Sequence, residues 1–282
     1  MSNLSKTFRY VNDDGGEIVF EYENGFLINK PNGIDTVTCK LNEAQGTEQT
    51  GSTVLSVNVQ SRSVTVSGIL VGEFQSENKD KLLAVVRPDL YGRLYADDYY
   101  LTVRPTATPT VGARNSFAAF QFTLKAPYPY WQRDESAEAR LSGVEYGFKF
   151  PWNQSRAYRF GTVITEQFIK LRNGGQVPVP YTLTFTALNE VVDPEILDAA
   201  SGKFLRINKT LAAGERVVVE ITHDRTYVTS SVDGECRGAL ELTSTLYQLS
   251  VGDNVLKPTA ASGLDNLKVT INFAQEIVGI TV

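Results

Sequence analysis

The sequence contains very little histidine and cysteine, and this scarcity limits the chemistry open to it. Its 282 residues include one histidine, His223, and two cysteines, Cys39 and Cys236. Zinc sites are built mostly from histidine and cysteine, so a zinc site is excluded in practice. The two cysteines lie far apart and outside any CxxC spacing, which predicts two free thiols in a reducing compartment. We therefore expect no metal and no cofactor.

An excess of positive charge and long apolar runs are also missing. There are 27 Lys and Arg residues against 32 Asp and Glu, a net charge of -5. Surface binding of nucleic acid needs a basic patch, and none is visible. The acidic composition is still compatible with a channel through which DNA only passes. No apolar run reaches the length of a membrane span, and the first residues, MSNLSKTFRY, do not resemble a signal peptide. We expect synthesis in the cytoplasm and no membrane partner.

Catalytic motifs are absent as well. The sequence has no GxSxG elbow, no phosphate-binding P-loop and no GxGxxG after a strand. A Ser-His-Asp site would have to use His223, which with Asp224 is typical of a surface turn. Asp97 and Asp98 are interpreted as a solvated turn rather than an acid/base pair. The sequence leaves open a pair of carboxylates for glycoside hydrolysis, because such pairs come together in space rather than in sequence. We expect no enzymatic activity.

A central stretch, residues 62–95, has the clearest pattern. It begins as a strand, one face of which carries Val64, Val66, Gly68, Leu70, Gly72 and Phe74 at period two. A helix is predicted next, with Ser76 as its N-cap and Pro88 beyond its end. Arg93–Ala96 is the following strand. Upstream, Ile18, Phe20 and Tyr22 alternate, and the turn Asn24-Gly25 predicts a hairpin with the strand that starts at Phe26.

Residues 41–61 differ from their surroundings because they are polar, with apolar residues only near the end. One interpretation is a mobile surface loop that closes into a strand. The other is an extended arm that becomes ordered against a neighbouring subunit, since a loop of this length in a compact domain is usually functional or disordered. The sequence alone leaves both open.

The rest of the chain predicts β-structure in two domains. Pro127 and Pro129 end a strand, aromatic residues accompany them, and charged residues follow, so we place the domain boundary near residue 133. The second half consists of short alternating segments separated by turn residues, which is typical of an antiparallel sandwich. The predicted fold class is mainly β: a β-rich N-terminal domain with one helix, residues 1–133, and a β-sandwich, residues 134–282.

The order of these segments resembles the distal tail protein family of tailed bacteriophages, also called the siphovirus tail component family. In the first half the matching pieces are Arg62–Gly72, the segment LLAVVRPDLYG at 82–92 and the strand end APYPYW at 126–131. In the second half they are NGGQVP at 173–178, SG at 201–202, AGE at 213–215, DG at 233–234 and LSVGDN at 249–254. The last is similar to the family's L-x-P-G-x-N segment, with Val251 in place of the proline.

The resemblance implies a structural role in the virion. Six copies of the first domain would close into a ring, the homohexameric baseplate hub, with residues 41–61 as the arm, or belt, that reaches the neighbouring subunit. The second domain would be a galectin-like sandwich outside the ring. The ring would join the tail tube protein to the tail-associated tip protein, with a receptor-binding protein or host saccharide as a further contact and DNA as cargo through its channel.

The subunit contacts that we expect from this resemblance lie in the arm and in the glycine-bearing strand. They are Gln45, Gly46, Thr50, Gly51, Val54, Val57, Val59, Gly68 and Gly72. The sandwich lacks the His-Asn-Arg-Trp-Glu set with which galectins bind sugar, since His223 and Arg225 have no matching Trp or Asn in register. The alternatives are a carbohydrate-binding host-adhesion module acting through the sandwich, a glycoside hydrolase, and a tail-tube protein that polymerises into long tubes.

Overall fold

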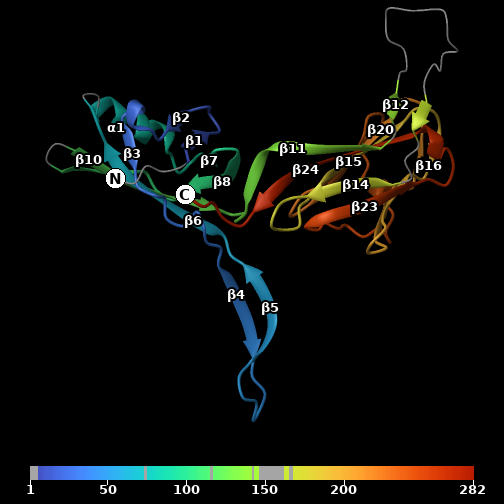
Figure 1. The fold of residues 1–282 in the computed structure, drawn as a ribbon, viewed down its shortest axis with the longest axis horizontal. Coiled ribbons are helices and arrows are strands. Elements are labelled where there is room, and N and C mark those ends of the chain that lie inside the picture. Colours follow the sequence, from blue (N-terminus) through green and yellow to red (C-terminus); the bar gives the residue numbers. More distant parts are fainter. Residues whose placement is uncertain (1–5, 73–74, 115–116, 142, 146–161, 165–167) are drawn as a thin grey trace, which may run out of the picture. The chain divides into compact units, whose positions relative to one another are not determined.

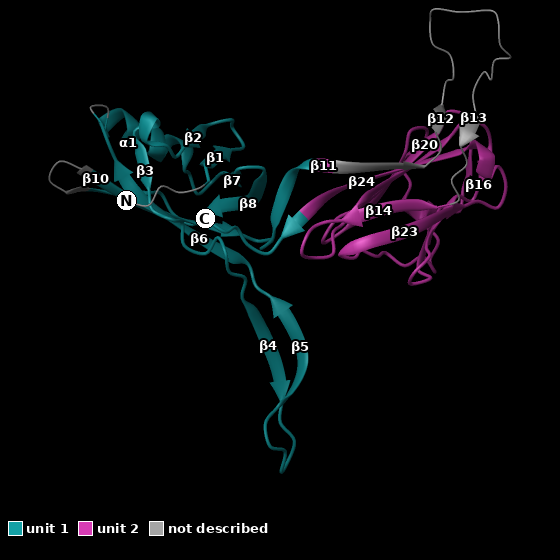
Figure 2. Ribbon diagram, in the orientation of Figure 1, with its two compact units in different colours: residues 1–135, 276–282 teal, residues 136–275 magenta. Residues whose placement is uncertain are grey.

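The computed structural model describes all of the chain except residues 1–5, 73–74, 115–116, 142, 146–161 and 165–167. The chain forms two compact units, residues 1–135 with 276–282 (unit 1) and residues 136–275 (unit 2) (Figure 2). The chain leaves unit 1 within strand β11 (Trp131–Leu141) and returns within strand β24 (Leu267–Ile277). The expected division put residues 134–282 in one domain; in the structure the last seven residues belong to unit 1 instead.

The expected fold class, mainly β, is confirmed. Unit 1 contains the only α-helix among the described residues, α1 (Gln75–Val85). Its other elements are β1 (Phe8–Asn12), β2 (Glu17–Val19), the 3-10 turn η1 (Tyr22–Asn24), β3 (Phe26–Ile28), β4 (Cys39–Ala44), β5 (Thr53–Val59), β6 (Arg62–Leu70), β7 (Gly92–Ala96), β8 (Tyr99–Pro105), β9 (Thr110–Arg114), β10 (Phe117–Ala126) and the first part of β11 (Figure 1).

The predicted strand–helix–strand unit is present as β6, α1 and β7. Val64, Val66 and Leu70 are buried on one face of β6, as their period predicts. Gly72 lies in the turn after the strand, and Phe74 falls outside the described residues. Helix α1 ends at Val85, where the side-chain amide of the buried Asn12 donates to the Val85 carbonyl at 3.0 Å. That bond satisfies one of the carbonyls that a helix leaves without a partner at its end.

The predicted hairpin at Asn24-Gly25 was wrong. Strand β2 pairs with β1, and β3 pairs with β6 through the register Phe26↔Leu70, Leu27↔Ile69 and Ile28↔Gly68. Gly25 instead ends the short η1 turn at φ 81°. Strands β2 and β3 therefore follow one another in sequence but pair with different strands, because both must bury their side chains in the core of unit 1.

Two antiparallel groups of strands enclose the core of unit 1. One group runs β2-β1-β7-β8, and the other contains β3, β6, β10 and β9. Aromatic rings fill the space between them: Phe20 meets Phe26 edge to face at a centroid distance of 6.1 Å, and Phe26 meets Phe120 at 6.1 Å. Such edge-to-face pairs contribute beyond their burial. Near the chain's end, Ile280 is buried in the same cluster, which explains why the last residues belong to this unit.

Gly68 is a packing position inside unit 1. A Cβ on Gly68 would lie 2.3 Å from the Leu27 carbonyl oxygen and 2.9 Å from the Ile28 Cα, both backbone atoms of the paired strand β3. We expect Gly68→Ala to destabilise unit 1 by about 2–4 kcal/mol, because the pairing of β3 with β6 must shift to make room. Thermal unfolding measures this.

Gly112→Ala is the matched control, since a Cβ there meets no atom within 4 Å. Equal melting temperatures for the two variants would contradict the assignment of Gly68 to close packing.

Unit 2 is an antiparallel sandwich, as expected. One sheet has the order β24-β15-β20-β21-β22 and the other β14-β23-β17-β18. The strands are β12 (Gly143–Glu145), β13 (Thr162–Ile164), β14 (Ile169–Asn173), β15 (Thr182–Ala187), β16 (Val191–Val192), β17 (Glu195–Asp198), β18 (Phe204–Arg206), β19 (Thr210–Leu211), β20 (Arg216–Ile221), β21 (Thr226–Ser230), β22 (Gly234–Glu235) and β23 (Gly252–Thr259), with the 3-10 turns η2 (Arg237–Ala239) and η3 (Leu264–Asn266).

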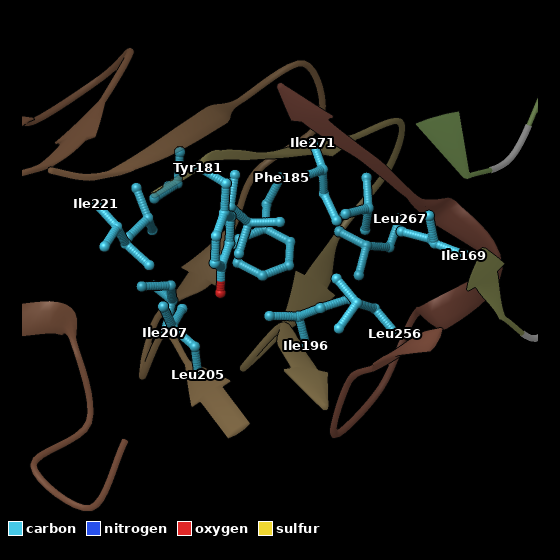
Figure 3. Close-up of a cluster of buried hydrophobic side chains, with 14 of the residues drawn as sticks. Ile169, Tyr181, Phe185, Ile196, Leu205, Ile207, Ile221, Leu256, Leu267 and Ile271 are labelled. Carbon is cyan, nitrogen blue, oxygen red and sulfur yellow. The ribbon is translucent and has the colours of Figure 1, made fainter. Parts of the chain in front are cut away.

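Side chains from both sheets of unit 2 meet in one apolar core. Phe185 and Ile271 from one sheet pack with Ile196 and Leu256 from the other (Figure 3). All four are buried, and each lies at an inward position of its strand. Burial of this kind is the dominant favourable contribution to folding, so unit 2 has a core of its own.

Unit 2 contains a partly buried ion-pair network around Lys209. Lys209 Nζ contacts carboxylates of both Glu215 and Asp233, and the Ser230 hydroxyl donates to Glu215 Oε1 at 2.6 Å. The Ala212 N–H donates to Glu215 Oε2 at 3.0 Å. Burial raises the pKa of Glu215, but the hydrogen bonds from Lys209, Ser230 and Ala212 outweigh it, so the pKa of Glu215 lies below 4.5.

This network predicts acid sensitivity of unit 2. A carboxylate whose pKa is lowered by folding adds stability above its unfolded pKa, and that stability is lost as the pH falls through the folded pKa. We expect Glu215→Gln to cost about 2 kcal/mol at pH 7 and to flatten the fall in melting temperature below about pH 4.5. Asp253→Asn is the control, because Asp253 pairs with Arg172 only at 3.9 Å on the exposed surface. An unchanged pH profile in Glu215→Gln would contradict this role.

Candidate assembly surface: the exposed arm

The segment that the sequence left open between loop and arm forms a two-stranded arm. Strands β4 and β5 pair only with each other among the described residues, and they extend away from the rest of unit 1 (Figure 1). Every residue of both strands is exposed. A two-stranded hairpin is marginally stable alone in water, so an arm of this kind gains from being covered.

The arm has one apolar and one polar face. Val59 pairs with Cys39 and Val57 with Leu41, while Leu55, two residues before Val57, continues the same face. We call these five residues the apolar arm face. The opposite face carries Lys40, Asn42, Ser56 and Asn58, and the Asn42 side-chain amide donates to Ser56 Oγ at 2.7 Å. The register shifts between Asn42 and Glu43, which leaves Leu55 without an opposite residue.

The apolar arm face is strongly exposed. Leu41 retains 46%, Leu55 68%, Val57 56% and Val59 47% of its accessible surface. Full burial of each such side chain is worth roughly 1.5–3 kcal/mol. An uninterrupted exposed apolar face on one side of a projecting arm marks an interaction site. The apolar arm face is therefore a candidate docking surface.

The tip of the arm, residues 45–52, is polar and hydrogen-bonded within itself. The Gly46 N–H donates to Gln49 Oε1 at 2.9 Å, and Gln49 Nε2 donates to Thr53 Oγ1 at 2.9 Å. The Ser52 hydroxyl donates to Glu43 Oε2 at 2.6 Å. Gly51 has φ 86°, a conformation that favours glycine. The tip closes the hairpin and keeps the two strands in register.

The root of the arm is fixed by the Ile34 carbonyl oxygen. It accepts from Arg62 Nη1 at 2.7 Å, from Trp131 Nε1 at 3.0 Å and from the Ile280 N–H at 3.0 Å. Arg62 also donates to the Val278 carbonyl. Ile34 precedes β4, and Arg62 follows β5. We call these contacts the arm root; they bind both ends of the arm to the last residues of the chain.

The arm root is buried, and this burial changes the properties of its charged residue. Arg62 is 3% exposed, and Ile34 and Trp131 are fully buried. Burial lowers the pKa of Arg62 to about 10, although Asp35 and Tyr130 act in the opposite direction. Arg62 Nε has no hydrogen-bond partner among the described residues. The charge is retained because two carbonyl oxygens receive its hydrogen bonds.

The predicted contact residues fall into five places. Gln45, Gly46, Thr50 and Gly51 form the tip, Val57 and Val59 lie on the apolar arm face, and Val54 sits beside the bulge, opposite Glu43. Gly68 is buried within unit 1, and Gly72 is an exposed turn residue with φ 88°. Cys39, Leu41 and Leu55 were missed. Their alternation was visible in the sequence, but the pairing register was needed to place them beside the valines.

A second surface of unit 1 contains a hollow with a neutral lining. The hollow lies on the outer side of the sheet of β6, β9 and β10, has a volume of about 660 Å³, and is lined by no charged residue among those described. Small neutral side chains dominate it, among them Ser67, Ala119 and Thr123. The Thr65 and Thr123 hydroxyls lie 3.2 Å apart on this side. We call this surface the neutral sheet face.

The described residues offer little that points to catalysis. No group of three or more His, Cys, Asp or Glu side chains gathers there in a way that could hold a metal ion. Asp97, in the predicted turn, pairs with Lys6 at 2.8 Å and accepts the Thr7 N–H at 3.1 Å. Both cysteines are free. Within the ranges described, no helix is long and apolar enough to cross a membrane.

Residues 174–276 match the family model described as siphovirus-type tail component, C-terminal domain. The resemblance to the distal tail family stated from the sequence is thereby confirmed for residues 174–276.

That fold is similar to the solved structure of the SPP1 Dit (gp 19.1) protein, described as a paradigm of the hub adsorption apparatus in phages that infect Gram-positive hosts. The TM-score is 0.70 at 14% identity, over 95% of this chain and 98% of that one. Chains of two phage P2 baseplate structures in the activated conformation, one with Ca and one with Sr, match over 98% of this chain at 10% identity with TM-scores of 0.49 and 0.48. No curated protein sequence matches the chain.

Proposed function

We propose that this chain is the hub subunit of a phage baseplate and that six copies close into a ring. The observation that carries the proposal is the apolar arm face, whose residues are all exposed on the paired strands β4 and β5. A head-to-tail contact needs an arm on one subunit and a complementary surface on the next, and such contacts form rings when the rotation closes. The hexameric number comes from the family resemblance.

In this proposal the apolar arm face packs on the neighbouring subunit, and the tip and Gly72 lie at the edges of the contact. The arm enters as a preformed hairpin, because its strands are already paired and its tip is hydrogen-bonded. Preformed structure lowers the entropy that is lost on association. Gly68 contributes through the packing of β3 against β6 rather than through a contact of its own.

The neutral sheet face fits the wall of the ring's channel. DNA carries a dense negative charge and binds surfaces rich in Lys and Arg. A wall of small neutral side chains in a chain of net charge -5 offers it no such contacts. DNA would then pass as cargo without being retained.

The ring would join the tail tube protein to the tail-associated tip protein in the virion, after synthesis in the host cytoplasm. A receptor-binding protein or a host saccharide is a further expected contact. This role is structural and requires no catalysis. A tail-tube protein would differ by stacking into long tubes rather than stopping at one ring.

Native mass by light scattering, with negative-stain images of the same sample, tests the proposal. We expect a closed ring with an open channel. Deletion of residues 44–52 should weaken the ring and leave both units folded, as judged by two unchanged unfolding transitions. Stable rings formed by the deletion variant would contradict the role of the arm, and long tubes would favour the tail-tube alternative.

A monomer at all concentrations would count against self-assembly of the hub. Addition of the tail-associated tip protein would then decide the question, because a hub that closes only on its partner forms the ring in that mixture. Absence of a ring in the mixture as well would overturn the proposal.

A further inference from the structure

A polar groove in unit 2 has no part in the proposed ring. Its volume is about 590 Å³. One side is the turn between β20 and β21, which contains His223 and Arg225; Lys203, Arg237 and the segment 246–250 line the rest. The sequence placed His223 and Asp224 in a surface turn, and the structure adds Arg225, Lys203 and Arg237 beside them. We call this the cationic groove.

The groove gathers positive charge in a chain that is acidic overall. Among the described residues, Lys203, Arg225 and Arg237 line it against one carboxylate, Asp224, while the whole chain has a net charge of -5 with histidine counted as neutral. Within the described parts of the chain, neither Lys203 nor Arg237 forms an ion pair. Asp224 is occupied locally, since it accepts from Thr222 Oγ1 at 2.9 Å and pairs with Arg225 at 3.3 Å.

The turn that presents these groups is held in place by its own hydrogen bonds. Thr222 Oγ1 accepts the Arg225 N–H at 3.0 Å, and the Thr222 N–H donates to the Arg225 carbonyl at 2.8 Å. The backbone positions of His223 and Arg225 are therefore fixed before any ligand arrives. A binding site that is largely preformed loses less entropy when it is occupied.

The remaining lining favours a hydroxylated ligand. Gln248, Ser250 and Thr222 supply amide and hydroxyl groups, and the ring of Tyr247, only 7% exposed, lies at the buried side of the groove. Leu246 is the one large apolar side chain in the lining that is substantially exposed. A peptide anchored by its side chains would need more exposed apolar contacts than this.

We infer that the cationic groove binds an anionic saccharide or polyol whose negative charge resides on phosphate or carboxylate groups. Guanidinium groups bind both anions through paired hydrogen bonds, and Lys203 adds a point charge. The hydroxyls and amide would bind the neutral part of the ligand. No tryptophan among the described residues lines the groove, so this recognition differs from that of galectins and depends on charge. It does not depend on the arm or on ring closure.

The test measures binding of simple probes to the full chain by calorimetry. The probes are glucose 1-phosphate, glucuronate, neutral glucose and a hexaglutamate peptide. His223 supplies a second measurement, because it is the only histidine and is exposed. Its modification by diethyl pyrocarbonate, followed by mass spectrometry, should slow when the groove is occupied.

We expect glucose 1-phosphate or glucuronate to bind and to protect His223, and glucose to do neither. Binding by the phosphate alone would identify a phosphate-bearing ligand, and binding by glucuronate alone a carboxylate-bearing one. The double variant Lys203→Gln/Arg237→Gln should lower the affinity at least tenfold. The matched control is Lys257→Gln/Arg172→Gln, which removes the same number of positive charges from the exposed surface of β14 and β23. This control should change the affinity less than twofold.

Three results would overturn the inference. They are protection by glucose as strong as by the anionic sugars, equal loss of binding in the control variant, and binding of hexaglutamate in preference to both anionic sugars. Failure of both anionic sugars to bind at millimolar concentration would also overturn it. None of these results bears on the ring, which is measured separately by native mass.

Discussion

Leu55→Asp/Val57→Asp is expected to convert the ring into monomers at micromolar concentration. Both side chains lie on the apolar arm face and are 68% and 56% exposed in the isolated chain. Their replacement therefore costs the folded monomer little. In the ring each new carboxylate would be buried against a neighbour without a partner, at a cost of several kcal/mol, and every subunit contact would carry two of them.

The matched control places the same charges on the other side of the same strand. Ser56→Asp/Asn58→Asp alters the polar face, where side chains already bear hydrogen bonds such as that of Asn42 with Ser56. Rings should survive this change. Loss of rings in both variants would show that net charge rather than the apolar arm face controls assembly. Intact rings in Leu55→Asp/Val57→Asp would show that the apolar arm face is not part of the subunit contact.

Removal of residues 278–282 should have the largest effect on stability, about 4–6 kcal/mol in unit 1. The truncation takes away the buried Ile280 side chain, the Ile280 N–H bond to Ile34 and the carbonyl of Val278 that accepts from Arg62. Arg62 would stay buried with fewer partners, and burial already lowers its pKa to about 10. The removal of a hydrogen-bond partner costs more free energy when the charged group is buried than when it is exposed.

Chemical denaturation of the full chain measures this effect as a shift of the unit 1 transition, with the unit 2 transition unchanged. Removal of Thr281 and Val282 alone is the control, since it keeps Val278, Gly279 and Ile280. Hydrogen exchange at the amides of β4 and β5 should also rise in the longer truncation, because the arm root is lost. Equal stability of the two truncations would contradict the arrangement described for the arm root.

Local patterns in the sequence were sufficient for the elements that depend on nearby residues. Strand β6 follows from the period of Val64, Val66 and Leu70, and α1 ends before Pro88, where a helix cannot continue. The prediction of a hairpin at Asn24-Gly25 was wrong because the pairing of strands depends on how their side chains pack in the shared core. A turn signal indicates only that the chain can bend there, and β3 pairs with β6, 42 residues away in the register Leu27↔Ile69.

The candidate assembly surface was predictable only in part, for a similar reason. Polarity and length left residues 41–61 open between a loop and an arm, the family resemblance implied the arm, and three valines were named. The five-residue apolar arm face depends on which residue of β4 lies opposite which residue of β5, including the shift beside Asn42. Gly68 shows the converse: a glycine in a strand indicates a close approach, but the approaching backbone belonged to β3 of the same chain. The cationic groove required residues from separate turns and could not be found by spacing.

The position of residues 278–282 has a practical consequence for work with the recombinant protein. Val278 and Ile280 contact Arg62 and Ile34, so this segment lies beside the base of the arm. A purification tag or fluorescent protein fused directly to Val282 would be attached next to the segment on which oligomerisation is proposed to depend. Samples for mass measurement and microscopy are better tagged at the other end of the chain, or through a long cleavable linker.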